Sequence, residues 1–226
     1  LEACADRYAL HRGTTEASFM RVLVLGLAYD DANRRHQNHV VRAIETAIAG
    51  VDLGMAIESV PCAVRLGVGE RGLDLAAGDA RARTLLARLD ADLAIFGEVN
   101  NPGAALLLRF AEAEAEAPAE AAPHEIVEAE KRELRLDANF DARLGAVLLG
   151  RAVSLYRSVW TNPGRFVADR IETAARLIAP LAEASPEALG VDGRRELHFT
   201  YALMLSTNGR QSGEASNLAL AIRHYD

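Results

Sequence analysis

This chain has few cysteines, few aromatic residues and no excess of positive charge. Its 226 residues include one tryptophan, 5% aromatics and two cysteines, Cys4 and Cys62. Two cysteines cannot build the dense disulfide framework of a small secreted domain, so we interpret them as reduced thiols of a cytosolic protein. The formal net charge of −7 argues against nucleic-acid binding, because phosphate contacts need a basic surface.

Long hydrophobic runs are also missing, although half of the residues are apolar. Without a run of about 18 apolar residues, the sequence predicts no membrane-spanning helix in these residues. The chain opens on Leu1 rather than Met and stops at Asp226 inside a predicted helix. We therefore interpret it as a fragment of a longer protein, and an upstream membrane anchor in the full-length protein stays open.

The first half of the chain alternates between strand and helix patterns. Apolar runs predict strands over 21–27, 56–66 (interrupted by Pro61), 93–97 and 104–110. Helical spacing predicts helices around 3–10, over 39–49 and over 78–90. This order predicts an α/β domain over 20–137, after an extension over 1–19. We expect a small, mostly parallel sheet with flanking helices and an antiparallel hairpin at its edge.

An acidic Ala/Glu/Pro segment over 111–123 separates this pattern from the second half of the chain. It carries no apolar stripe and is typical of a solvated loop, with a further edge strand expected within 124–136. From 138 to 226 the sequence predicts helices over 140–156, 166–184, 196–207 and 214–225. The Asn208–Gly213 loop is expected to join the last two.

The last helix pair resembles a tetratricopeptide repeat. Tyr201, Ala202 and Leu205 lie on its first helix, Gly209 opens the turn, and Ala219 and Tyr225 stand where the second helix would pack back. The first half is similar to the small α/β domain of TolB-N-terminal, FlgO and CsgG-type proteins, on the segment 91–99 (ADLAIFGEV) and the return strand that ends at Phe110. Together the two halves resemble bacterial tetratricopeptide proteins. The resemblance implies a scaffold or sensor role and carries over no catalytic residue.

A spaced-glycine segment follows the second strand. Gly67, Gly69 and Gly72 match the dinucleotide-binding spacing, whose chemistry is backbone N–H groups closing on a pyrophosphate at a helix start. The segment neither follows the first strand nor opens a helix directly, so a flexible loop is the simpler interpretation.

Polar residues also gather after the first strand. Asp30, Asp31, His36 and His39 could bind a divalent metal. A polar cap explains them more simply, with Asp31 or Asn33 satisfying free amides at the start of the next helix beside ordinary surface histidines. Six arginines could line the carboxyl ends of the strands, where open α/β sheets bind ligands: Arg34, Arg35, Arg65, Arg71, Arg81 and Arg83. Glu98 is the carboxylate best placed for catalysis, yet no partner base or nucleophile accompanies it.

These patterns favour a non-enzymatic scaffold or adaptor of a bacterial signalling or assembly system, located in the cytoplasm. We expect protein partners on the helical repeats, homodimerisation or a self-shielding terminal helix, no nucleic-acid partner, and no metal, cofactor or catalytic residue. The alternative is a sensor that holds an anionic small molecule or nucleotide at the sheet edge. Its candidate residues are Arg34, Arg35, Gly67, Gly69, Arg71 and Glu98. An enzyme that uses Glu98 or the Asp30/His36 group is the third and least favoured class.

Overall fold

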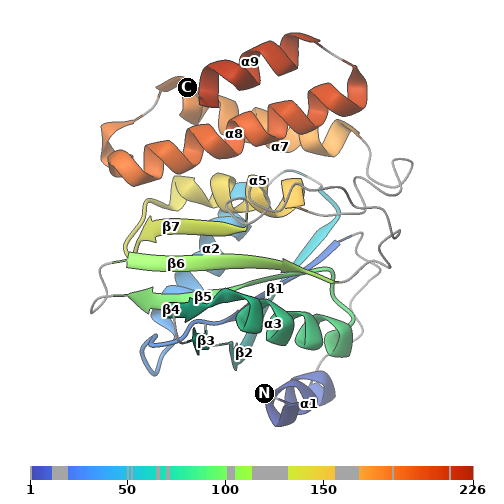
Figure 1. Ribbon diagram of the computed structural model, residues 1–226, viewed down its shortest axis with the longest axis vertical. Coiled ribbons are helices and arrows are strands. Elements are labelled where there is room, and N and C mark those ends of the chain that lie inside the picture. The colour runs from blue at the N-terminus through green and yellow to red at the C-terminus, as the bar shows by residue number, and fades with distance from the viewer. Residues whose placement is uncertain are drawn as a thin grey trace. The chain divides into compact units, whose positions relative to one another are not determined.

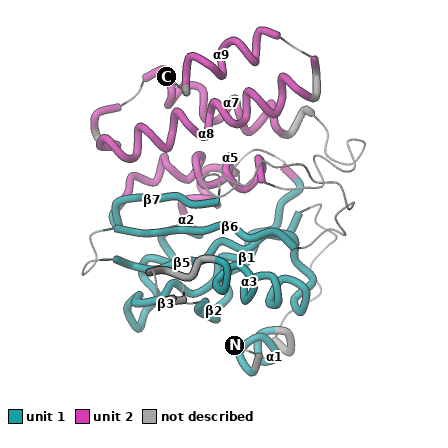
Figure 2. The backbone as a smooth tube through the Cα atoms, in the orientation of Figure 1, with its two compact units in different colours: residues 1–41, 54–139 teal, residues 42–53, 140–226 magenta. Residues whose placement is uncertain are grey.

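The computed structural model describes residues 2–11, 20–49, 51, 53–64, 67–69, 72–100, 105–113, 132–155, 168–184, 186–213 and 215–225. It divides into two compact units, one of residues 1–41 and 54–139 and one of residues 42–53 and 140–226 (Figure 2). The chain is a mixed α/β protein, as the sequence predicts. In the part of the chain that the structure describes, no helix combines the length and the apolar composition needed to cross a membrane.

The first unit is built on a five-stranded mixed sheet in the order β2-β1-β5-β6-β7 (Figure 1). Strand β1 (Met20–Gly26) runs parallel to β2 (Met55–Ala63) and to β5 (Leu93–Asn100). Strands β6 (Ala105–Glu112) and β7 (Glu133–Asp137) continue the sheet in antiparallel pairs. The parallel pairs and the antiparallel hairpin are both confirmed, but the sheet is mixed and not mostly parallel, because β6 and β7 also pair antiparallel. The loop expected over 111–123 begins later than predicted, because β6 runs through Glu112; residues 114–131 lie outside the described residues.

Three helices accompany this sheet. Helix α1 (Glu2–His11) and α3 (Leu75–Leu89) pack on one face, and their side chains share a buried cluster with alternate residues of the strands. Helix α3 begins three residues before the predicted start at Gly78. Helix α2 (Arg35–Ile48) contributes residues 35–41 to this unit and the rest to the second unit. A two-stranded hairpin of β3 (Gly67–Gly69) and β4 (Gly72–Asp74) precedes α3.

The second unit is helical. A 3-10 turn, η1 (Ala142–Leu144), leads into α5 (Gly145–Leu155), and α7 (Ala168–Ala184) follows. After η2 (Glu187–Leu189), helix α8 (Gly190–Ser212) and α9 (Ala215–Tyr225) form an antiparallel hairpin (Figure 1). Helices α5, α7 and α8 approach closely at Gly150, where a Cβ atom would lie 2.5 Å from Ile178 Cδ1 and 2.8 Å from Met204 Sδ. A larger residue at this position would separate the helices.

The last hairpin corrects two details of the repeat resemblance. Gly209 does not open a turn, because α8 continues through it to Ser212 and the chain reverses at Gly213, which has φ +74°. Only a residue that tolerates this left-handed conformation ends the helix well, and glycine does. Ala219 is exposed, and Ala221 (2% exposed) packs against α8 in its place. The helix hairpin was therefore predicted, but not its turn or its inner face.

Candidate functional site

The carboxyl ends of β1, β2 and β5 meet at one edge of the sheet, because the three strands are parallel. After β1 the chain crosses this edge in the loop 27–34 and enters α2. An isolated bridge between Ala28 and Glu98 extends the pairing of β1 and β5 beyond the regular ladder. This edge is where the sequence predicted a ligand or metal site.

Asp30 is the best connected side chain of the loop. Its carboxylate accepts hydrogen bonds from the backbone N–H groups of Asp31 (2.9 Å), His36 (3.2 Å) and Gln37 (2.9 Å) and contacts Nδ1 of His36 at 2.8 Å. Burial raises the pKa of Asp30, but the hydrogen bonds from Gln37 and His36 outweigh it, so the pKa lies below its ordinary value.

Asp31 completes the helix start by accepting hydrogen bonds from the backbone N–H groups of Asn33 and Arg35. The predicted cap is therefore confirmed for Asp31 and not for Asn33, and Asp30 joins it without having been predicted to. Within the described ranges no group of three or more His, Cys, Asp or Glu side chains could hold a metal ion. Because the Asp30 carboxylate already fills the helix start, this position disfavours a second anion such as a nucleotide phosphate.

Arg34, at the end of the loop, and Arg35, at the start of α2, have different surroundings. Arg34 is exposed and has a positive φ of 53°, a conformation that ordinary residues rarely adopt. Arg35 donates a hydrogen bond of 3.2 Å to Oδ1 of Asn139. This contact directs one guanidinium to the end of the β7 segment and gives it a structural partner.

The glycine segment is a hairpin. Gly67 pairs with Asp74 and Gly69 pairs with Gly72, so the glycines lie in an antiparallel ladder and not in a loop that opens a helix. Arg65 and Arg71 lie outside the described residues. The flexible loop expected here is therefore wrong for the described glycines, and the ladder takes up backbone groups that a dinucleotide loop would turn toward phosphate.

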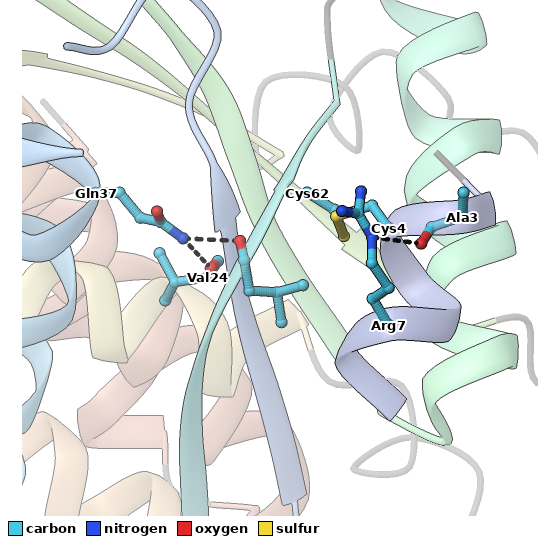
Figure 3. The surroundings of a disulfide bond; sticks show 7 residues. Ala3, Cys4, Arg7, Val24, Gln37 and Cys62 are labelled. Carbon is cyan, nitrogen blue, oxygen red and sulfur yellow. Dashed lines mark hydrogen bonds between the residues drawn. A yellow bond between two sulfur atoms is a disulfide. The ribbon is translucent and has the colours of Figure 1, made fainter. Parts of the chain in front are cut away.

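Glu98 lies apart from the Asp30–His36 pair. It pairs with Leu107 and follows Phe96 by two residues, and these two apolar side chains belong to the cluster beneath α1 and α3. Alternation along the strand thus places Glu98 on that face. Gln37, at the start of α2, lies on the other side of β1 and β2 (Figure 3). The structure therefore does not assemble Glu98, Asp30 and His36 into one catalytic group.

A bulge beside this edge was not predicted. The register of β1 and β2 shifts between Leu25 and Gly26, where Pro61 lacks an N–H group. Nε2 of the fully buried Gln37 donates to the carbonyl oxygens of Val24 and Val60, both at 2.8 Å (Figure 3). A Cβ atom at Gly26 would lie 3.0 Å from the Pro61 carbonyl oxygen. Strand β2 thus continues through Pro61, and the predicted interruption is this bulge.

The interpretation of the cysteines is wrong. Cys4 on α1 and Cys62 on β2 form a disulfide across 58 positions of sequence, with Cα atoms 5.7 Å apart (Figure 3). The two cysteines are close because α1 packs against β2, the edge strand of the sheet, and no local pattern in the sequence predicts that contact. Cys62 is 2% exposed and Cys4 is half-buried.

Two polar contacts inside the helical unit were also missed. Arg151 on α5 is fully buried, donates to Oε2 of Glu196 at 2.8 Å and to the Thr200 hydroxyl at 3.3 Å, and lies over the Phe199 ring. Their positions, 45 residues apart, give no sequence signal. Between α8 and α9, Nδ1 of His198 lies 3.0 Å from Nδ1 of His224 and the rings stack. Burial, and then His198, lower the pKa of His224.

The outer face of α9 carries a row of exposed apolar residues. Exposed residues recur at i, i+3, i+4 and i+7 as Ala215, Leu218 (36% exposed), Ala219 and Ile222 (62% exposed). We call these four residues the α9 stripe. The α8 side of the helix carries the half-buried Leu220, the buried Ala221 and His224. Helical spacing in the sequence could have identified this stripe, but not that it faces outward.

Comparison with known proteins gives no match. No family model, no curated protein and no solved structure matches this chain. The resemblance to tetratricopeptide proteins and to the CsgG and TolB-N-terminal domains therefore stays a prediction. Function is argued from the geometry alone.

Proposed function

We propose that this chain is a non-enzymatic scaffold that binds a partner protein through the α9 stripe. The carrying observation is the exposed α9 stripe, in which Leu218 and Ile222 are accessible to solvent. Apolar side chains at this spacing, on one face of a helix, are typical of helix-to-helix recognition. The capping role of Asp30 and Asp31 supports the non-enzymatic part of the proposal.

The proposed occupant is an amphipathic helix of another protein. The stripe spans Ala215 to Ile222, about 10 Å along the helix axis at the usual rise per residue. A contact through so short a stripe would bury less than the roughly 1,200 Å² of a stable pair, so we expect a transient partner and not a stable dimer.

The exposed fractions of Leu218 and Ile222 determine how much the stripe can contribute to the affinity for a partner. Leu218 and Ile222 together expose about the surface of one complete aliphatic side chain. Burying one such side chain contributes about 1.5–3 kcal/mol, which is roughly a tenfold to 150-fold change in affinity. A single charge at Ile222 is expected to remove most of it.

The disulfide bears on the compartment. Disulfides persist in oxidising compartments and are rare in the cytoplasm, so the Cys4–Cys62 bond favours an oxidising location over the expected cytoplasmic one. We include this location in the proposal. The redox state of Cys4 and Cys62 in the native host tests this location. A disulfide there supports it, and two free thiols contradict it.

Site-directed photo-crosslinking in the native host tests the scaffold proposal. A photoreactive residue at Leu218 is expected to give an adduct with a second protein, mapped to an apolar helical segment, and Ile222→Asp is expected to abolish it. The matched control places the same photoreactive residue at Ser216, which is exposed on α9 but lies off the stripe. An adduct that survives Ile222→Asp, an adduct with a second copy of this chain, or no adduct at all contradicts the proposal.

A further inference from the structure

Helix α1 covers the β2 half of the sheet face on which α3 also packs. Ala5 is fully buried in the cluster that contains Leu25, Val60 and Cys62, and Cys4 and Tyr8 pack against the same cluster. Helix α1 contacts β2 and α3, and α3 contacts β5 and β6. The two helices therefore divide the face between them, and the β2 half depends on α1 for its cover.

The polar contacts described for α1 include one ion pair and one hydrogen bond to the sheet. The ion pair, Asp6 with Arg88 at 2.9 Å, joins two exposed side chains, and such pairs contribute about 0–1 kcal/mol. The Tyr8 hydroxyl donates to Oε2 of Glu58 at 2.8 Å, while Arg21 holds the other oxygen of that carboxylate. A helix of 10 residues is marginal on its own in water, so α1 needs a stronger attachment to stay folded on the sheet.

We propose that the Cys4–Cys62 disulfide is a redox-sensitive strap: intact it holds α1 on the sheet, and its reduction releases α1 and uncovers the apolar face of β2. The reductant is a dithiol. One of its thiolates attacks the Cys4 sulfur, the less buried side of the bond, and Cys62 leaves as a thiolate. The second thiol of the reductant then displaces Cys4, so both cysteines end as thiols and the dithiol ends as a disulfide.

The release exposes a surface that the closed state keeps from water. Leu25, Val60 and Cys62 are each no more than 2% exposed when α1 is in place. Strand β2 is also the edge of the sheet, and an uncovered edge with apolar side chains is a surface for association with another chain. The strap thus connects the redox state of the surroundings to the accessibility of this edge.

Hydrogen exchange measured by mass spectrometry tests the strap. The oxidised chain is compared with the chain treated with dithiothreitol, with the gain of two hydrogens verified on the intact mass. On reduction we expect the amide protection of residues 2–11 and 55–63 to fall at least roughly tenfold, while residues 93–100 and 105–112 keep theirs. Cys4→Ser is expected to show the released pattern with and without dithiothreitol.

Tyr8→Phe is the matched control, because it removes the hydroxyl that donates to Glu58 and leaves the disulfide intact. Its α1 protection is expected to match that of the oxidised parent. The strap is wrong if reduced chain keeps α1 protected, if Tyr8→Phe releases α1 as fully as reduction does, or if β5 and β6 lose protection together with α1. It is also wrong if the protein isolated without reductant carries two free thiols.

Discussion

The buried pair of Arg151 and Glu196 gives the sharpest prediction about the helical unit. Glu196→Leu keeps a side chain of similar length but removes the carboxylate that lies 2.8 Å from the Arg151 guanidinium. Arg151 is fully buried, so it would lose this carboxylate without gaining water. Breaking a buried ion pair from one side costs about 3–5 kcal/mol, and we expect the free energy of unfolding to fall by that amount.

The reverse change, Arg151→Met, is expected to be milder. Glu196 is 12% exposed at its side chain and keeps a second cation, because Arg195 lies 3.2 Å from its Oε1. The lost contact with the Phe199 ring adds about 1–2 kcal/mol at most. The double variant Arg151→Met/Glu196→Leu replaces the pair by apolar groups and is expected to recover to within about 1 kcal/mol of the parent.

Urea unfolding followed by far-ultraviolet circular dichroism measures all three variants, and the parent and the double variant complete a thermodynamic cycle. The coupling between the two positions is the quantity of interest. A loss below about 1 kcal/mol for Glu196→Leu, or a double variant as unstable as that single one, would refute the argument that an uncompensated charge dominates.

Three further predictions concern other parts of the chain. The pKa of His224 lies below its ordinary value of 6.5, so the unfolded chain takes up a proton at a higher pH than the folded chain does. The helical unit is therefore expected to lose stability as the pH falls through about 6.5. In urea titrations, His224→Gln is expected to flatten this dependence. Gly97→Ala would place a Cβ atom 1.9 Å from a β6 carbonyl oxygen at φ +155°, and we expect it to lower the free energy of unfolding by more than about 3 kcal/mol. At Gly213 a Cβ atom would meet nothing within 4 Å, so Gly213→Ala should cost only about 1 kcal/mol for its left-handed φ. Thermal unfolding compares the two variants. Gln37→Leu leaves two buried carbonyl oxygens without their side-chain donor and should destabilise the sheet unit by about 2–4 kcal/mol. Chemical unfolding measures this loss, and an unchanged unfolding curve would contradict it.

The sheet was predictable where one local pattern sufficed. The centres of β1 and β5, residues 22–26 and 93–97, are continuous apolar runs, as buried parallel strands require. The return from β5 to β6 is a hairpin that the polar residues between them in the sequence indicate. Helix α7 likewise follows its apolar spacing. Each of these elements depends on neighbours in sequence, and the sequence shows them directly.

The site features were predictable only in part. Asp31 precedes a helix, and its capping role follows from that position, whereas the share of Asp30 in the cap was not predicted. The disulfide, the Arg151–Glu196 pair and the contact between His198 and His224 depend on how distant elements meet, and no periodicity records that. The turn at Gly213 was missed because Gly209 offered an equally plausible helix end, and only the packing of α8 distinguishes them.

The bulge between β1 and β2 has a consequence for how this protein can vary. Proline at 61 removes a ladder donor, glycine at 26 admits the displaced carbonyl, and the Gln37 amide binds the oxygens left over. Replacing any one of them alone leaves the other two mismatched, so substitutions at these three positions should occur jointly in divergent versions of the chain. Joint variation of Gly, Gln and Pro at this spacing is thus a fingerprint by which remote relatives of the sheet unit could be found.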